Sequence, residues 1–289
     1  MSDGAGRGAA PILVVLLAVI GVWYVAALAL NLPAAQAVAG ERAAAGAVIR
    51  AAWSLDRPLL PAPHQIAQSL LTGVFAEPPT SPRSLLYHAG VTAGTAAIGF
   101  LLALVFGVGL AVAIVHQRTL DRSLMPWVIA SQTIPVLAIA PMVVVVLGNI
   151  GLTGILPKAL IAGWLSFFPI TTAMVTGLRA PDRMQLDLLH TYSASGRDVF
   201  AKLRWPASMG FLFAGVKVAA TLALVGAIVA ELPTGAQAGL GARLLAGSYY
   251  GQTLQIWSAL VMAALLTLLA VALTDCAQRV LIARRGGRL

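Results

Sequence analysis

The chain has 289 residues, of which 59% are hydrophobic and only 10% are charged, and its formal net charge is +9. A soluble domain carries about 25% charged residues, so this composition excludes an ordinary soluble globular fold. The basic residues lie between apolar runs rather than in a stretch with interleaved aromatic residues, which argues against nucleic-acid binding. One cysteine, Cys276, allows no intrachain disulfide and no cysteine-built metal site. The four histidines match no ligand spacing, so we expect no metal and no cofactor.

Apolar runs long enough to cross a bilayer recur along the chain. A spanning helix needs roughly 20 predominantly apolar residues. The six predicted spans are 11–30, 89–115, 124–147, 155–178, 208–232 and 256–274. The first is longer than the apolar core of a signal peptide, which has about 7–15 residues, so we expect a retained helix. The sequence therefore predicts an all-α, polytopic transmembrane bundle.

The longest stretch with polar residues, 31–84, separates the first two predicted spans. Its alanine-rich part, Ala37 to Trp53, carries charges and predicts a helix outside the membrane. A proline-rich connection follows, because prolines at this density interrupt helices. After it, we expect a short amphipathic helix at about 66–75.

The distribution of Lys and Arg predicts the orientation, because basic residues are enriched in cytoplasmic flanks. One side of the membrane collects Arg7, Arg118, Arg122, Arg179, Arg183, Arg197, Lys202, Arg204, Arg279, Arg284, Arg285 and Arg288. The other side collects Arg42, Arg50, Arg57, Arg83, Lys158 and Arg243. We therefore expect both termini in the cytoplasm.

Small residues recur at about every fourth position in two predicted spans, a pattern that lets helices approach closely in lipid. These residues are Gly90, Gly94, Gly99, Ala103, Gly107 and Ala111 in one span, and Gly215, Ala219, Ala223 and Ala227 in the other. Either both rows pack helices within one subunit, or one row meets a second copy of the chain around a shared pathway.

Three prolines interrupt the predicted span 124–147, and Pro135 is the middle one. Such breaks persist in a bilayer only where protein or a water-lined cavity satisfies the freed backbone groups. The neighbouring polar candidates are Ser131, Gln132 and Thr133. A broken helix of this kind suits a translocation pathway, but it also occurs as a plain kink.

Two ionisable residues fall in the predicted span 208–232, where a charge usually faces a cavity or a partner. Glu231 continues the row of small residues by one four-residue step, which favours a gate or a packed interface. The alternative is that it marks the end of the helix. Lys217 either snorkels to the headgroups or faces a cavity.

The cytoplasmic segment 179–206 is too long and too polar for a simple connection. We expect a first short helix starting at Pro181 and Asp182 and stopped by Gly196. Ser195 begins a capping signal for a second helix, which Pro206 should end. The first helix carries an apolar stripe at four-residue spacing, made of Met184, Leu188 and Tyr192. Such a stripe predicts burial in a partner protein, the alternative being the headgroup surface of the bilayer.

This segment resembles the cytoplasmic coupling loop of binding-protein-dependent ABC importer permeases, in particular the nitrate, sulfonate, taurine and pyrimidine-precursor group. The resemblance lies in DLLHTYSAS at 187–195 and FAKLRWP at 200–206. Supporting motifs in the same order are LLPAP at 59–63, TIPVLAIAP at 133–141, FFPI at 167–170, AEL at 230–232 and GLG at 239–241. The resemblance covers about residues 59–285 and implies a type I importer permease fold.

The family's loop usually has Glu-Ala-Ala followed four residues later by Gly. Here Asp187 keeps the charge, leucines replace the alanines, and Ser193 stands at the glycine, which predicts a bulkier docking face. Without the family's glycine, we expect the turn of the loop at Gly196 or at Ser193 itself. The expected ATPase-coupling residues are Asp187, Leu188, Leu189, Tyr192, Ser193, Ala194, Ser195 and Gly196. The candidates for a pathway or gate are Ser131, Gln132, Thr133, Pro135 and Glu231.

The resemblance implies the permease of an ATP-driven importer in a bacterial cytoplasmic membrane. Its partners would be two cytoplasmic ATP-binding subunits, a second permease copy in a homodimer, an extracytoplasmic solute-binding protein and membrane lipid. The solute would be a small organic molecule, pyrimidine- or thiamine-precursor-like or sulfonate- or nitrate-like. We assign 1–58 to an N-terminal tail, the first span and an extracytoplasmic segment, and 59–285 to the permease domain with its coupling loop 179–206.

None of the three lysines follows a glycine, so the chain has no GxxxxGK phosphate-binding loop and we expect it not to be an enzyme. The rival prediction is a secondary transporter or channel driven by an ion gradient. Such proteins often have internal repeats and carboxylates near the midplane, neither of which is evident here. A membrane-embedded enzyme would need a reactive set of side chains, and no such set stands out.

Overall fold

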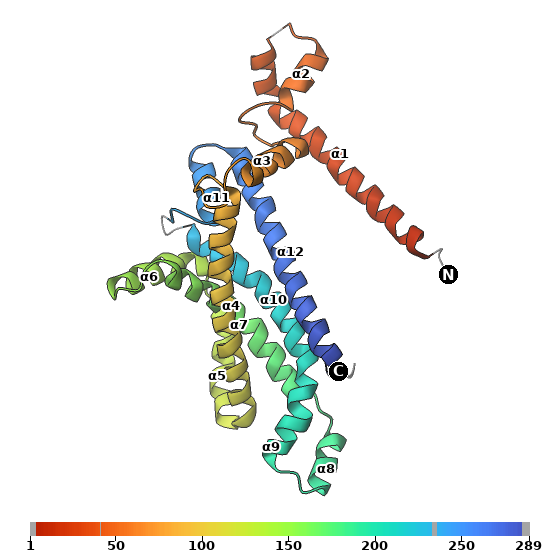
Figure 1. Cartoon of the computed structure of the whole chain (residues 1–289), viewed down its shortest axis with the longest axis vertical. Coiled ribbons are helices and arrows are strands. Elements are labelled where there is room, and N and C mark those ends of the chain that lie inside the picture. The colour runs from red at the N-terminus through yellow and green to blue at the C-terminus, as the bar shows by residue number, and fades with distance from the viewer. Residues whose placement is uncertain (1–3, 41, 233–235, 285–289) are drawn as a thin grey trace. The chain divides into compact units, whose positions relative to one another are not determined.

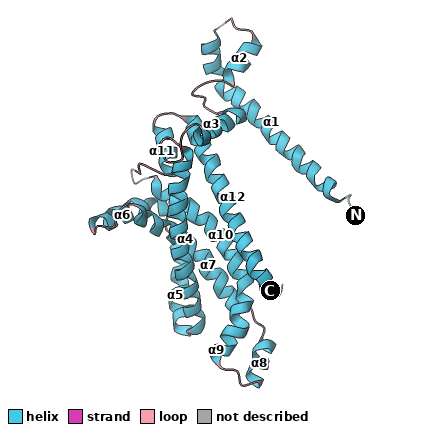
Figure 2. Ribbon diagram, in the orientation of Figure 1, coloured by secondary structure: helices cyan, strands magenta, loops and turns pink. Residues whose placement is uncertain are grey.

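The computed structural model describes residues 4–40, 42–232 and 236–284, and within them the regular elements are helical (Figures 1 and 2). The helices are α1 Gly4–Ala39, α2 Ala45–Ala52, α3 Pro63–Phe75, α4 Leu85–His116, α5 Arg118–Ala130, α6 Val136–Asn149, α7 Ile155–Arg179, α8 Arg183–Thr191, α9 Gly196–Val199, α10 Trp205–Glu231, α11 Leu240–Tyr249 and α12 Thr253–Arg284.

Among the described residues, five helical segments are long and apolar enough to cross a membrane. They are Pro11–Ala39, Leu85–His116, Ile155–Arg179, Gly196–Glu231 and Thr253–Ala283. A sixth crossing is added if the pair Arg118–Thr133 and Val136–Asn149, bent by 102°, counts as one span. The prediction of an all-α, polytopic bundle is therefore confirmed.

The predicted span 124–147 is not one straight helix, because α5 and α6 meet at this 102° bend. A 3₁₀ turn, Ser131–Thr133, closes α5, and Ile134 and Pro135 are extended before α6 begins. The residue before a proline avoids the helical region, so the backbone turns where Pro135 stands.

The chain divides into two compact units. The first unit comprises the chain up to Tyr87 together with Arg243–Met262, and the second comprises His88–Ala242 together with the chain from Ala263 onward.

In the first unit, α1 runs on into the segment for which we predicted a separate helix over 37–53. The separate helix is present, but its predicted bounds are wrong, because α1 ends at Ala39, Gly40 adopts a left-handed φ of 93°, and only Ala45–Ala52 form the new helix. Alanine favours continuation of α1, and glycine at the position after a helix stops it. The amphipathic helix expected at 66–75 is present as part of α3, which Pro63 begins.

Asn31 ties the proline-rich connection of the first unit to α1. Its Oδ1 accepts a hydrogen bond from the backbone nitrogen of Leu59 at 2.7 Å, and its Nδ2 donates to the carbonyl of Leu60 at 2.8 Å. The indole nitrogen of Trp23 donates to the carbonyl of Pro61 at 3.0 Å. These contacts satisfy backbone groups that the prolines leave outside a helix.

In the second unit, α7 is the central helix and both rows of small residues pack on it. A Cβ atom on Gly99 of α4 would lie 2.6 Å from the carbonyl oxygen of Ala159, and one on Gly215 of α10 would lie 2.6 Å from that of Pro169. Ala219 and Ala227 of α10 have no exposed surface. The α10 row and the α4 row from Gly99 onward therefore pack within one chain, and the alternative that these faces meet a second copy is wrong, whereas Gly90 is exposed.

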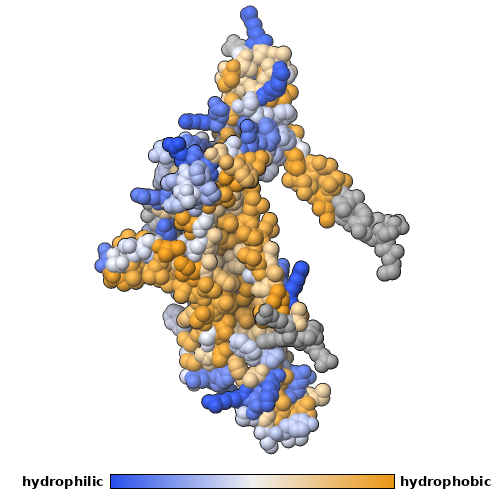
Figure 3. Space-filling model, in the orientation of Figure 1, coloured by the Kyte–Doolittle hydropathy of each residue, from blue (hydrophilic) through white to orange (hydrophobic). Residues whose placement is uncertain are grey.

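The surface of the second unit separates apolar from polar residues. In Figure 3, hydrophobic residues gather over α6 and the helices next to it, while hydrophilic residues gather around α8 and α9. Exposed apolar side chains include Val105, Phe106, Val145 and Leu268. A surface of this kind is stable against lipid and unstable in water.

Candidate functional site

The first candidate site is the segment that contains α8, at one end of the second unit (Figure 1). Asp182 caps the helix, since its Oδ1 accepts a hydrogen bond from the backbone nitrogen of Arg183 at 2.6 Å. Gln185 completes a capping box, because its Oε1 accepts from the backbone nitrogen of Asp182 at 3.2 Å. The helix thus begins where Pro181 and Asp182 predicted it.

The end of α8 differs from our prediction, because Gly196 does not stop it. The helix ends at Thr191, and Ser193 then adopts a left-handed φ of 54°. The backbone nitrogen of Ala194 donates to the carbonyl of Leu189 at 3.0 Å, which closes the turn. A non-glycine residue in this conformation costs about 1–2 kcal/mol, so the turn at Ser193 is held by its surroundings.

Gly196 instead begins α9, with Ser195 as its cap. The Ser195 hydroxyl accepts from the backbone nitrogen of Asp198 at 3.2 Å and donates to its carboxylate at 2.6 Å. Lys202 pairs with the same carboxylate at 2.7 Å. The short α9 and its cap therefore form one hydrogen-bonded unit on the surface.

The prediction that Pro206 ends this second helix is wrong. A π-helical turn, Phe200–Arg204, joins α9 to α10, and Pro206 falls in the first turn of α10. The π turn changes the register of the backbone hydrogen bonds, so the missing N–H of the proline does not break the helix. One helical segment therefore runs from Gly196 to Glu231.

The apolar stripe predicted on α8 is exposed. Met184 is 76% exposed, Leu188 57% and Tyr192 76%. No residue of α8 is buried, and Leu189 is the partly buried member of the predicted coupling set on this helix. The row is therefore accessible both to a partner protein and to the headgroup surface of a bilayer, the two alternatives that the sequence left open.

Contacts with other helices hold this segment in place. Arg179 at the end of α7 forms an ion pair with Asp121 of α5 at 2.9 Å. The ring of Phe200 lies 5.0 Å from that of His116 at the end of α4. The sequence did not identify Asp121 and His116 as contacts of this segment. The one sequence signal for these contacts is that both residues lie near helix ends on the same side of the membrane.

The second candidate site is the break between α5 and α6. The Ser131 hydroxyl donates to the carbonyl of Val128 at 2.7 Å, and the Thr133 hydroxyl donates to that of Ala130 at 2.7 Å. Gln132 contacts the Ser131 hydroxyl at 3.4 Å. These hydroxyls satisfy carbonyls next to the break, as predicted, and Pro135 stands at the bend.

The third candidate site surrounds Glu231, which has no exposed surface. The Thr92 hydroxyl lies 2.9 Å and 3.0 Å from the two carboxylate oxygens, to which it donates. The backbone nitrogen of Gly241 donates to Oε2 at 2.8 Å, and that of Leu240 donates to the Thr92 hydroxyl at 2.8 Å. Glu231 therefore lies in a packed interface inside the chain and does not simply mark the end of a helix.

Gly239 completes this cluster around Glu231. Its φ is +119°, and a Cβ there would overlap the Glu231 carboxylate. Its backbone nitrogen donates to Nδ1 of His88 at 3.0 Å. The GLG motif is thus required by close packing on the carboxylate, whereas nothing in the sequence pointed to Thr92 or His88.

Lys217 forms an ion pair with Asp275 of α12 at 2.5 Å. Among the described residues, no group of three or more His, Cys, Asp or Glu side chains could hold a metal ion.

Comparison with known proteins assigns the family. A model described as binding-protein-dependent transport system inner membrane component matches residues 83–287. The chain belongs to this family. The match contains all three candidate sites, and it makes the chain a multi-pass ABC transporter permease of an import system for small solutes.

Two relatives illustrate the similarity, and both are transport permeases rather than enzymes. The formylaminopyrimidine transport permease protein of Halalkalibacterium halodurans is 33% identical over 183 residues, which cover 63% of this chain and 68% of the relative. The riboflavin transport system permease protein of Chloroflexus aurantiacus is 32% identical over 167 residues, 58% of this chain and 60% of the relative.

Proposed function

We propose that this permease imports a small organic solute and is driven by two separate cytoplasmic ATP-binding subunits that grip α8. The observation that carries this proposal is the exposed stripe formed by Met184 and Leu188 on α8 and by Tyr192 directly after it, on a helix capped at its start. Asp187 lies beside the stripe and provides a charge at the rim of the docking face. A groove of an ATP-binding subunit that buries this stripe gains the free energy of removing apolar surface from water.

Movement of α8 passes into the membrane through the continuous helix from Gly196 to Glu231. This segment has 36 residues, and at about 1.5 Å per residue it reaches about 50 Å. When ATP closes the ATP-binding subunits, α8 moves with them and displaces α10 against α7. We assign to Glu231, at the other end of this helix, the role of a gate whose hydrogen bonds to Thr92 and Gly241 change between two states.

The remaining parts of the proposal follow from the family. A second copy of this chain forms the other half of the pathway, an extracytoplasmic solute-binding protein delivers the solute, and both termini lie in the cytoplasm. The two relatives are named for transport of heterocyclic compounds, which favours a solute of the pyrimidine- or thiamine-precursor class over a sulfonate or nitrate. Residues 1–58 comprise an N-terminal tail, the first span and an extracytoplasmic segment, and residues 59–285 form the permease domain.

The substitution Leu188→Asp tests the coupling role, because it places a charge in the centre of the apolar stripe. We expect uptake of the solute in proteoliposomes containing the full complex to fall at least about tenfold, since a desolvated charge costs several kcal/mol. His190→Asp is the matched control, because His190 is exposed on the same helix about 200° away from Leu188. It should transport like the wild type.

Normal uptake by Leu188→Asp in correctly inserted protein would remove the coupling role of α8. Uptake driven by an imposed ion gradient, with no ATP-binding subunit present, would instead support the rival secondary transporter or channel.

A further inference from the structure

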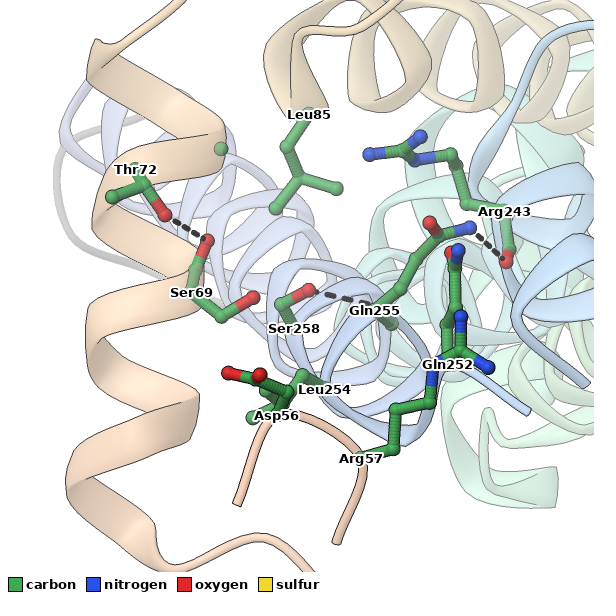
Figure 4. A pocket seen from close by; sticks show the side chains of 11 residues that line it. Asp56, Arg57, Ser69, Thr72, Leu85, Arg243, Gln252, Leu254, Gln255 and Ser258 are labelled. Atoms are coloured by element: carbon green, nitrogen blue, oxygen red, sulfur yellow. Dashed lines mark hydrogen bonds between the residues drawn. The ribbon is translucent and has the colours of Figure 1, made fainter. Parts of the chain in front are cut away.

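A polar cavity of about 380 Å³ lies within the first unit (Figure 4). Its lining comes from four parts of the chain: the connection before α3, α3 itself, the start of α4, and the segment from α11 to the first turns of α12. The lining residues used below are Asp56, Arg57, Ser69, Arg243, Gln255 and Ser258.

Arg243 lines this cavity, and its guanidinium is only partly satisfied by the protein. Its Nε is buried and has no hydrogen-bond partner in the part of the chain that the structure describes. Its Nη2 donates to the carbonyl of Arg83 over a long distance of 3.4 Å. A buried donor on a charged group costs free energy when it is unpaired. A hydrogen-bond acceptor beside this guanidinium would therefore stabilise it.

The charges around the cavity favour an anion. Arg57 and Arg243 are its two cations and Asp56 is its one acid. Among the described residues, no carboxylate forms an ion pair with either arginine. Burial lowers the pKa of Arg243, because desolvation disfavours the charged guanidinium, and a bound anion would oppose that effect.

Two long helices begin at the cavity. Leu85 is the first residue of α4, and Gln255 lies in the first turn of α12, and each of these helices has 32 residues. The N-terminus of a helix carries a partial positive charge and backbone donors without partners in the helix. The cavity also lies at the start of two candidate membrane spans, Leu85–His116 and Thr253–Ala283, and the ends of spans are where headgroups are expected.

We propose that this cavity binds a phosphate group, the chemistry presented by the headgroup of an anionic phospholipid. The Nη donors of the Arg243 guanidinium and its positive charge suit a phosphate oxygen, and Arg57 supplies the second positive charge. Hydroxyl groups of Ser69 and Ser258 line the same cavity, as Figure 4 shows. The carboxylate of Asp56 accepts a hydrogen bond from the hydroxyl or ammonium group of the headgroup.

The test measures binding to the delipidated full chain in detergent at constant ionic strength. One arm titrates phosphatidylglycerol and follows the bound lipid by native mass spectrometry, and the other titrates inorganic phosphate in a calorimeter. We expect Arg57→Gln and Arg243→Gln to bind about tenfold more weakly than the wild type, as the loss of a charged hydrogen bond implies. Arg50→Gln is the matched control, because Arg50 is exposed in the first unit and does not line the cavity.

The two arms distinguish the source of the phosphate. Tight binding of phosphatidylglycerol with weak binding of the free ion supports a lipid site, and equal binding of both supports a site for free phosphate. If Arg243→Gln does not fold, Arg57→Gln and Arg243→Lys, which keeps the charge but loses the planar fork, carry the test. Pocket variants that bind like Arg50→Gln in both arms would overturn the proposal.

Discussion

Glu231 is the acidic side chain of α10, and its burial at the end of an apolar helix requires several compensating donors. An ionised carboxylate removed from water costs several kcal/mol unless it is hydrogen-bonded. Thr92 and the backbone of Gly241 provide these hydrogen bonds, and Gly239 leaves room for the carboxylate. Glu231 therefore helps to fix the 239–241 segment, together with Thr92 and His88.

Thr92→Val tests this dependence, because it removes the hydroxyl and keeps the shape of the side chain. The change deprives Glu231 of a donor and the backbone nitrogen of Leu240 of its acceptor, so we expect a loss of about 1–3 kcal/mol in stability. The measurement is the midpoint of thermal unfolding of the purified protein.

Thr95→Val is the control for this substitution. Thr95 is equally buried on the same helix, but its hydroxyl donates to the carbonyl of Val91 within α4. We expect a change well below that of Thr92→Val. Identical midpoints for the two variants would show that the Thr92 hydroxyl does not anchor Glu231.

At the scale of helices, α7 is the element on which the second unit is built. Its backbone is approached closely by Gly99 of α4 and by Gly215 and Gly226 of α10. Since lipid provides no hydrophobic force between apolar helices, close backbone packing supplies most of the attraction. Any movement of α10 in transport must therefore slide along this contact with α7 or take α7 with it.

Gly99→Ala tests the contact between α4 and α7. The added Cβ would lie 2.6 Å from the carbonyl oxygen of Ala159 and 2.7 Å from the Cβ of Ala162, so the helices must separate. We expect a loss of about 1–3 kcal/mol, seen as a lower midpoint of thermal unfolding. Gly90→Ala is the control on the same helix, because no atom lies within 4 Å of its Cβ position. Gly90→Ala should be neutral or slightly stabilising, since alanine favours the helix by about 1 kcal/mol relative to glycine. Equal losses of stability in both variants would contradict close packing at Gly99.

At the scale of the whole molecule, the proposed topology places α8 in the cytoplasm and α2 outside it. The single cysteine, Cys276, makes this testable, because Cys276→Ser provides a background without thiols. In that background we expect Arg50→Cys to react with a membrane-impermeant maleimide in intact spheroplasts. His190→Cys should react only after the membrane is permeabilised, because basic residues favour the cytoplasmic side. Labelling of His190→Cys in sealed spheroplasts would reverse the orientation and remove access of an ATP-binding subunit to α8.

The sequence by itself determined the helical, membrane-spanning class, the positions of most spans, the start of α8 and the family. Each of these depends on local properties: the length of an apolar run, a cap such as Asp182, or a motif read in order along the chain. Such properties act over a few residues and are therefore visible without the fold.

Only the tertiary structure decided how these elements meet. The choice of Ser193 over Gly196 for the turn, the continuous passage through Pro206 and the size of the bend at Pro135 each depend on which neighbours satisfy or strain the backbone. The partners of Glu231 and Lys217 lie on other helices, 139 residues away in the case of Thr92. A hydrogen bond or ion pair between distant segments leaves no periodic trace in the sequence, because it is set by the packing of the helices that carry it.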